Sequence, residues 1–145
     1  ATIVHADLLE PDGILEAPET LSLLDFSEPV AVLMIAVLHF VPEAAKPGKI
    51  IQRFHRELSP GSFLAISHGT GEHCPEIAGP VVRLYERTSS PLPLRSREQV
   101  ISLLSGFDVV EPGVVYVPEW HPDTAEDIWE NPAKSVLYGA VGYKV

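Results

Sequence analysis

The longest apolar run of the chain predicts a central strand. Val30–Val37 (VAVLMIAV) is apolar throughout, a pattern typical of a strand that is buried on both faces of a sheet. Its short length and its β-branched residues favour a strand over a helix. Since Pro42 cannot donate to a sheet ladder, we expect the strand to end near Val37 or Leu38. The sequence therefore predicts a buried strand at the centre of the fold.

His39 directly follows this predicted strand. Open α/β sheets bind ligands outside the carboxyl ends of their strands, so a polar side chain at this point stands where chemistry is expected. The alternative is a histidine in an exposed loop between a strand and a helix. Position along the chain does not decide between the two.

Downstream, the pattern changes from helical spacing to a second strand. We expect a helix from near Pro47 to the Ser59-Pro60-Gly61 stop, and one apolar stripe recurs along it at helical spacing: Ile50, Ile51, Phe54 and Leu58. The short buried strand Phe63–Ser67 follows. With the central strand these elements form one β-α-β unit, whose two strands should be parallel.

Less regular segments complete the chain. Ser96 and Gln99 form a plausible capping box that opens a helix, which Gly106 ends. The other expected elements are strands over Thr2–Ala6 (ending in Asp7), within Phe107–Val117 (bent at Pro112-Gly113) and over Ser135–Val145, helices over Pro18–Leu24 and about Pro80–Arg87, and a Ser89–Pro93 linker. Pro118–Pro132 should be an irregular loop, either a lid over a pocket or a surface loop anchored by two buried indoles, Trp120 and Trp129.

Composition limits the kinds of partner. The 145 residues suffice for one domain with one core. A hydrophobic share of 46% and a mean hydropathy of +0.14 place the chain among globular proteins. The net charge of −10, from 20 acidic and 10 basic residues, opposes binding to nucleic-acid phosphates or to an anionic membrane surface. A small molecule or another protein is the expected partner.

Cysteine usage and the first residues bear on location. Cys74 is the single cysteine, so an internal disulfide is excluded and nothing argues for export. The start lacks the basic and apolar segments of a signal peptide, and no apolar run reaches the roughly 18 residues of a membrane span. We therefore expect a cytoplasmic protein. Because Ala1 leads almost at once into an expected strand, we also expect a fragment or a processed chain.

Three familiar kinds of site are poorly supported. His68, His73 and Cys74 lack the second cysteine pair or the H-E-x-x-H helix of a metal site, so no metal is expected. Gly69-Thr70-Gly71 lacks the third glycine of a phosphate-binding loop. A serine hydrolase is disfavoured because no serine stands in a G-x-S-x-G elbow. Asp7 could accept hydrogen bonds from a ligand amine or hydroxyl, or it could be a solvated turn residue.

Several segments together resemble class I S-adenosylmethionine-dependent methyltransferases. Residues 37–42 (VLHFVP), the helix with Ile50 and Phe54, and the LSPGS turn at 58–62 are similar to the part of those enzymes after the central strand. Further segments look like one actinobacterial branch, the DUF574 family: residues 36–42, 58–62, 67–68, 95–97, 110–113, 118–120, 122–123 and 138–142. The similarity covers nearly the whole chain.

The resemblance implies a fold, a cofactor and site residues. The fold would be α/β, a Rossmann-like class I methyltransferase sheet that is mostly parallel with an antiparallel last strand. The cofactor would be S-adenosyl-L-methionine. Carried over by position, its binding residues would be Asp7 and Leu8 beside the adenine, Ala36 and Val37 on the methionine side, and His39 and Phe40 bordering the methyl-transfer pocket.

The implied chemistry is methyl transfer to an unidentified small-molecule acceptor. Such transfer requires mostly alignment of the acceptor in a dry pocket. A base is needed only if the acceptor must lose a proton, and the catalytic candidates for that role are His39 and His68, which would lie on the substrate side. The alternative is a methyltransferase-like cofactor-binding or regulatory module without turnover.

One part of the family pattern has no counterpart in the chain. The glycine-rich first loop and the acidic residue that binds the ribose hydroxyls are missing, together with the strands that carry them. Residues 1–145 are therefore expected to be the C-terminal part of a single methyltransferase-like domain. The missing N-terminal half, or a neighbouring chain, would complete the sheet, and the fragment alone should be inactive.

Overall fold

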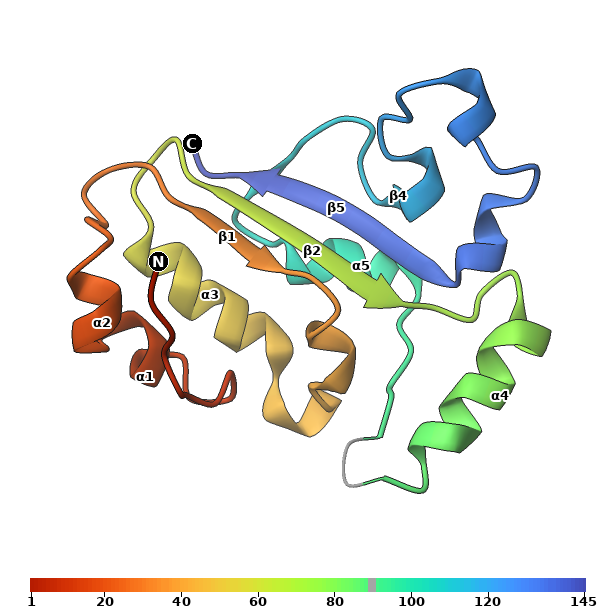
Figure 1. Ribbon diagram of the computed structural model, residues 1–145, viewed down its shortest axis with the longest axis horizontal. Coiled ribbons are helices and arrows are strands. Elements are labelled where there is room, and N and C mark those ends of the chain that lie inside the picture. Colours follow the sequence, from red (N-terminus) through yellow and green to blue (C-terminus); the bar gives the residue numbers. More distant parts are fainter. Residues whose placement is uncertain (89–90) are drawn as a thin grey trace.

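A five-stranded sheet organises the fold (Figure 1). The computed structural model describes residues 1–88 and 91–145. The strands are β1 (Ala31–Met34), β2 (Phe63–Gly69), β3 (Asp108–Val109), β4 (Val115–Tyr116) and β5 (Leu137–Tyr143). They lie in the order β1-β2-β5-β3, and β4 also pairs with β5. Within the described residues, β1 is therefore an edge strand.

The strand pairing confirms the predicted β-α-β unit and the final strand. β1 and β2 are parallel, with Ala31 opposite Phe63. β5 runs antiparallel to β2 along the full length of both strands, and β3 and β4 are antiparallel to β5 as well. The sheet is thus mixed: β1, β2, β3 and β4 run in one direction, and β5, the last strand, runs opposite to all of them, as expected. Among the described strands, β1 and β2 are the neighbours joined by a parallel ladder.

The helices α3 (Pro47–Glu57) and α5 (Arg97–Leu103) cover one face of the sheet. Pro47 occupies the first turn of α3, where its missing N–H has no helical partner to lose. The hydroxyl of Ser96 accepts from the Gln99 amide, and the Gln99 side chain accepts from the Ser96 amide, which confirms the capping box that opens α5. Gly106, φ +97°, follows α5 as the expected stop.

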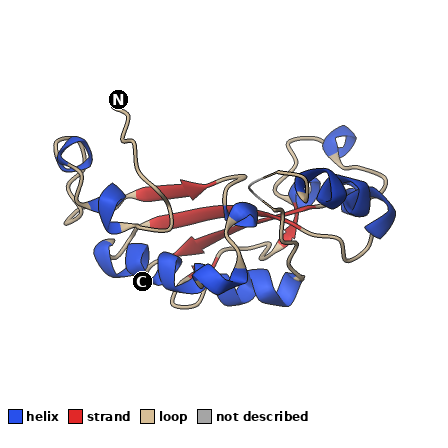
Figure 2. Cartoon of the chain, turned by 90° about the horizontal axis from the view of Figure 1, so that it is seen from below, coloured by secondary structure: helices blue, strands red, loops and turns tan. Residues whose placement is uncertain are grey.

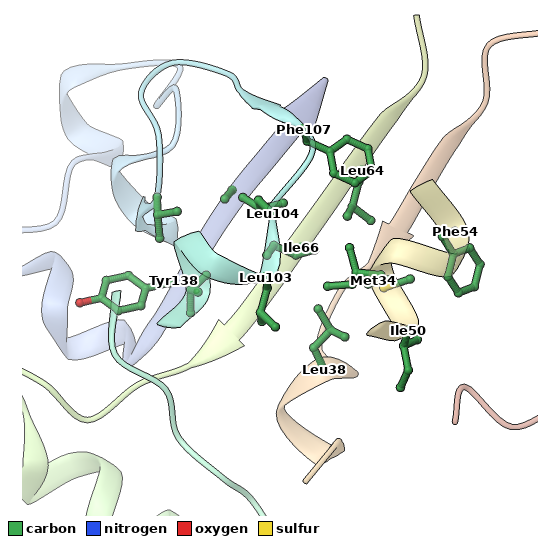
Figure 3. Packing of buried hydrophobic residues seen from close by; sticks show 14 of the residues in the cluster. Met34, Leu38, Ile50, Phe54, Leu64, Ile66, Leu103, Leu104, Phe107 and Tyr138 are labelled. Carbon is green, nitrogen blue, oxygen red and sulfur yellow. The ribbon is translucent and has the colours of Figure 1, made fainter. Parts of the chain in front are cut away.

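The core lies between the sheet and these two helices. Figure 3 shows Leu64 and Ile66 of β2 beside Leu103 and Leu104, with Met34 of β1 nearer α3. The predicted stripe of α3 is buried there together with Leu38. Alternate residues of a strand point to opposite faces, so β2 presents residues 64, 66 and 68 to the helices and residues 63, 65 and 67 to the other face.

The second face of the sheet is largely uncovered. In Figure 2 the helices beside the strands lie below them. Leu33 of β1 is 68% exposed and Phe63 of β2 is 42% exposed. Ile35 and Val37, just beyond β1, are exposed as well. An apolar surface of this kind on a folded chain marks a contact site for another part of a protein or for a ligand.

This arrangement corrects the prediction for the central run. The strand covers only Ala31–Met34, and Ile35–Val37 form a turn. Burial on both faces is wrong too, because Met34 is buried while Leu33 is mostly exposed. The physical reason is the position of β1 at the edge of the sheet, with its outer side and one face free. The apolar pattern describes an environment that these 145 residues do not supply.

Other predictions fail at segments that depend on distant partners. Thr2–Ala6 forms no strand, because none of the described strands lies beside it to complete a ladder.

The short helices are α1 (Asp12–Leu15) and α2 (Pro18–Leu21). The helix expected from Pro80 is α4 (Pro75–Tyr85), which takes Pro75 at its first turn and keeps Pro80 inside. The Ser89–Pro93 linker falls partly outside the described residues.

The C-terminal third has shorter strands than predicted. The strand expected within Phe107–Val117 is two short strands, β3 and β4, separated by the predicted bend, where Gly113 has φ +90°. The Pro118–Pro132 segment is irregular, as expected, with short 3₁₀ turns. Its anchoring by two buried indoles is wrong, because Trp129 is 50% exposed. Among the described helices, none is long and apolar enough to cross a membrane.

Candidate functional site

The candidate site lies at the carboxyl ends of β1 and β2, which point toward α4 in Figure 1. After Met34 the chain turns sharply at Ala36, whose φ of +56° is rare for a residue with a Cβ. The Ser67 hydroxyl at the end of β2 accepts a hydrogen bond of 2.8 Å from the Ala36 amide. A 3₁₀ turn, Leu38–Phe40, follows and carries His39. His39 is therefore five residues beyond the strand, not directly after it.

A buried arginine connects this turn to β2. Arg95 is only 4% exposed. Its guanidinium donates to the carbonyl oxygens of Leu38 (3.4 Å) and Val41 (3.1 Å), which flank the turn, and to the carboxylate of Glu43 (3.1 Å). Nη1, the nitrogen that donates to Leu38, also lies 2.6 Å from Nε2 of His68. The fork geometry of one guanidinium thus holds the His39 turn against the end of β2.

His68 is fully buried, and both of its ring nitrogens are occupied. Nδ1 lies 2.9 Å from the carbonyl oxygen of Gly69, which assigns the proton to Nδ1. Nε2 then accepts from Arg95. Burial, together with the positive charge of Arg95, lowers the pKa of His68 to about 4. His68 is consequently neutral at physiological pH, and its lone pair already has a donor.

His39, in contrast to His68, has a ring nitrogen without a hydrogen-bond partner among the described residues. Its ring packs edge-on against Phe40, with the ring centroids 4.5 Å apart. The centroid of the His68 ring lies 6.1 Å away. Burial lowers the pKa of His39, so the imidazole is largely uncharged at neutral pH. Within the described ranges, Nδ1 of His39 is buried without a hydrogen-bond partner. Such an unsatisfied buried nitrogen is costly and is typical of functional sites.

A cavity of about 200 Å³ adjoins His39. Its walls come from the end of β2, from α4, from the segment before α5 and from the start of β5. Val81 and Tyr85 of α4 line it, as do Leu92 and Leu94. The polar side chains in the wall are those of His39, Thr70 and Ser135, together with the Tyr85 hydroxyl, and no lining residue carries a formal charge.

The structure brings only some of the predicted site residues together. His39, Phe40 and His68 lie within one cluster. Ala36 and Val37 lie exposed on the turn that leads into it. Asp7 and Leu8 belong to the N-terminal segment that does not join the sheet. The carboxylate of Asp7 accepts from the Leu9 amide at 2.9 Å, the hydrogen bond of a local turn.

Sequence reasoning gave Arg95 no role beyond a matching motif. Neither spacing nor composition distinguishes a buried arginine from a surface one, since burial depends on carbonyl groups that the fold brings from elsewhere. The same holds for a second polar network, in which the Tyr138 hydroxyl donates to Glu72 (2.9 Å) and lies 3.3 Å from the Tyr116 hydroxyl. Within the described ranges no group of three or more His, Cys, Asp or Glu side chains is placed to hold a metal ion.

Comparison with known proteins gives a consistent result. Residues 1–145 match the model of a family described as S-adenosyl methyltransferase. A solved structure of a DUF574 family protein from Streptomyces avermitilis MA-4680 is 39% identical, with a TM-score of 0.91 over 97% of this chain. A candidate methyltransferase from Thermobifida fusca YX is 26% identical, with a TM-score of 0.85 over 96% of this chain.

The matches cover only part of those structures. This chain spans 53% of the Streptomyces protein and 52% of the Thermobifida protein, about half of each. No curated protein matches the chain.

Proposed function

The chain belongs to the S-adenosyl methyltransferase family, and from this premise we propose that it forms part of an enzyme that transfers a methyl group from S-adenosyl-L-methionine to a small-molecule acceptor. The fold in this proposal is the Rossmann-like class I sheet. The observation that carries it is the turn beyond the end of β1, which has Ala36 at positive φ and is followed by an uncharged His39 in the wall of a cavity. Ligands of open α/β sheets bind at such strand ends.

The residues present fit one side of the cofactor. Ala36 and Val37 are exposed and form a small apolar surface on the turn. The Asp7 carboxylate is also exposed, and one of its oxygens accepts from the Leu9 amide. In the proposal Ala36 and Val37 line the methionine side, Asp7 and Leu8 the adenine, and His39 and Phe40 border the pocket. When bound, the cofactor supplies an electrophilic methyl group on a positively charged sulfur.

The protein's own contribution would be alignment, exclusion of water and removal of a proton. The apolar walls of the cavity would favour an apolar acceptor over water once the domain is complete, and the Arg95 bonds hold the His39 turn in one position. His39 is the proposed proton acceptor, because it lines the cavity and because burial lowers its pKa and so leaves the imidazole unprotonated. The neutral His68 would act as a positioning residue, since its Nε2 is held by Arg95.

The proposal includes a partner for the uncovered side of the sheet. β1 has a free edge, and Leu33, Ile35 and Phe63 expose apolar surface next to it. The chain also spans about half of each solved structure that it matches. We expect the N-terminal half of the domain, or a neighbouring chain, to cover this side and supply the rest of the cofactor site.

One observation favours the alternative of a binding or regulatory module without turnover. Of the two histidines predicted to be catalytic, His68 has both nitrogens engaged within the protein. If the acceptor requires two proton-transfer groups, the site offers only His39. A module of this kind would bind the cofactor through the same residues.

Calorimetry on the intact gene product separates these possibilities. S-adenosyl-L-methionine and its demethylated product are titrated separately, and methyl transfer is followed with a panel of hydroxylated and aminated acceptors. Micromolar binding with transfer to an acceptor supports the enzyme. Binding with no transfer to any acceptor supports the module, and absence of binding rules out both.

A further inference from the structure

We propose that the methyl acceptor is an uncharged aromatic compound of one or two rings with a single hydroxyl group, bound in the cavity beside His39 with that hydroxyl directed at the imidazole. This inference rests on the proposed function, because it assigns a substrate class to the same site. It is carried by the walls of the cavity, which restrict the charge, the shape and the polarity of a ligand.

The walls first restrict charge. Among the residues that the structure describes, no side chain with a formal charge lines the cavity, and Val81, Leu92 and Leu94 contribute apolar surface. A carboxylate or an ammonium group would lose its hydration here without gaining a partner, which is costly. The buried guanidinium of Arg95 is no substitute, because it is already bonded to Glu43, to His68 and to two carbonyl oxygens. The ligand is therefore neutral.

The walls also restrict size and shape. A cavity of about 200 Å³ is smaller than the roughly 300–1,000 Å³ of pockets that hold drug-sized ligands. Tyr85 and His39 are both in the wall, and the Tyr85 ring lies 5.5 Å from that of Phe40. Aromatic faces and edges of this kind favour another ring. One or two fused rings fit both the volume and the aromatic wall.

Few polar groups remain to orient such a ring. The Thr70 hydroxyl accepts from the Glu72 amide at 3.3 Å, and the Ser135 hydroxyl donates to the Leu137 carbonyl at 3.3 Å. His39 lines the cavity as well and is uncharged at neutral pH, and the Tyr85 hydroxyl completes the polar side chains of the wall. A neutral imidazole has one nitrogen that can accept a proton. A single hydroxyl group on the ligand is the complement of that acceptor.

The reaction on such a substrate balances without a further reagent. The hydroxyl oxygen forms a bond to the methyl carbon as the bond from that carbon to the sulfonium sulfur breaks, and the electron pair of the broken bond stays on sulfur. His39 receives the hydroxyl proton and returns it to solvent. The products are an aryl methyl ether and the neutral thioether of the cofactor.

The test measures binding on the intact gene product, saturated with the demethylated cofactor so that no turnover occurs. The probe is 2-naphthol, compared with naphthalene, with the anion 2-naphthoate and with the cation 2-naphthylmethylammonium, by calorimetry. We expect 2-naphthol to bind, and each of the other three to bind at least roughly tenfold more weakly, because each lacks the hydroxyl or carries a charge. Binding of naphthalene, the anion or the cation as tight as that of 2-naphthol, or no binding of 2-naphthol, overturns the proposal.

A pair of variants locates the site. Val81→Asp places a carboxylate in the cavity wall, and Ile101→Asp makes the same change on α5, at a similarly exposed residue outside the cavity. We expect Val81→Asp to weaken 2-naphthol binding at least roughly tenfold and Ile101→Asp to leave it unchanged, while both still bind the cofactor product. Equal binding of 2-naphthol by Val81→Asp and the unaltered protein overturns the proposed location.

Failure of the proposed function gives a different result. If 2-naphthol binds in the cavity but no methylated product forms after S-adenosyl-L-methionine is added, the acceptor class holds for ligand binding and the enzymatic function fails. If methyl transfer occurs only with charged acceptors, the function holds and the acceptor class fails.

Discussion

The two faces of the sheet differ in cover although their residues are similar. On β2, Leu64 and Ile66 point toward α3 and α5 and are almost completely buried, while Phe63 on the opposite face is 42% exposed. On β1, Met34 is buried and Leu33 is 68% exposed. The side chains on both faces are apolar, so the difference lies in what packs on them. One face is completed by this chain, and the other has the composition of a surface that another segment covers.

The largest expected effect tests this difference with one matched change on each face. Leu64→Ala leaves a cavity under α3 and α5 and should lower the free energy of unfolding by about 2–5 kcal/mol. Leu33→Ala on the exposed face should change it by no more than about 0.5 kcal/mol. Urea unfolding of the 145-residue chain, followed by circular dichroism, measures both values. Equal costs for the two changes would contradict the description of the faces.

Leu64→Ala and Leu33→Ala also compare the two faces of the sheet in the intact gene product. If the N-terminal half covers the second face, the cost of Leu33→Ala there should rise toward that of Leu64→Ala. A cost that stays near zero in the intact protein would rule out the proposed cover.

The next largest effect on stability is expected for Arg95, which connects the His39 turn to the end of β2. Arg95→Met removes the donor to His68 and to two buried carbonyl oxygens, and it should cost about 3 kcal/mol of the free energy of unfolding because those acceptors remain buried. Arg53→Met is the control, since Arg53 pairs with exposed carboxylates on α1 and α3 and should cost about 1 kcal/mol or less. Similar losses for both variants would mean that Arg95 acts as an ordinary surface residue.

A pH titration of stability tests the burial of His68. Its folded-state pKa of about 4 lies below the ordinary 6.5, so the unfolded chain binds more protons between these two values. The stabilisation is fully present above pH 6.5 and is lost as the pH falls toward 4, by up to about 3 kcal/mol. Burial lowers the pKa of His39 as well, which adds a loss in the same direction.

Urea unfolding at a series of pH values from 7 to 4 measures this dependence. The variant His68→Gln should lose the larger part of it, while His121→Gln, at an exposed position, should retain it. A titration curve for His68→Gln identical to that of the unaltered chain would show that His68 is accessible to protons in the folded state.

The smallest effect is expected at the N-terminal segment. Asp7→Ala in the intact gene product should weaken binding of S-adenosyl-L-methionine roughly tenfold, about 1.4 kcal/mol, if its carboxylate accepts from the adenine amino group. Asp123→Ala removes an exposed carboxylate from the irregular loop and should leave the affinity unchanged. Calorimetry gives both dissociation constants, and equal affinity of the Asp7 variant and the unaltered protein would remove Asp7 from the cofactor site.

The sequence predicted well those elements whose partners lie within the chain. The stripe of α3, the capping box of α5 and the strands β2 and β5 follow from local spacing and from cap residues, and α3 and β2 adjoin in sequence. Thr2–Ala6 has a strand pattern but no neighbour among the described strands, and the Val30–Val37 run is suited to two covered faces and has one. A periodic pattern reports the environment for which a segment is suited, and it does not report whether that environment is present.

The candidate site was predicted less completely, because the partners of its side chains come from distant parts of the sequence. His39 and Phe40 could be located because they follow an apolar run, although the turn at Ala36 displaces them beyond the strand end. His68 was assigned a possible base function that requires a free nitrogen, and the carbonyl of Gly69 and the guanidinium of Arg95 engage both nitrogens. Arg95 is far from His68 in sequence. Only the folded chain shows that the Arg95 guanidinium occupies Nε2 of His68.

The free edge of β1 has a consequence for handling the protein. Its backbone donors and acceptors on the outer side are available to any strand of suitable direction, and the apolar residues Leu33 and Ile35 lie beside them. Edges of this kind join between molecules unless charges, prolines or bulges prevent it. We therefore expect these 145 residues alone to self-associate at high concentration, and Leu33→Lys should raise the concentration at which precipitation begins.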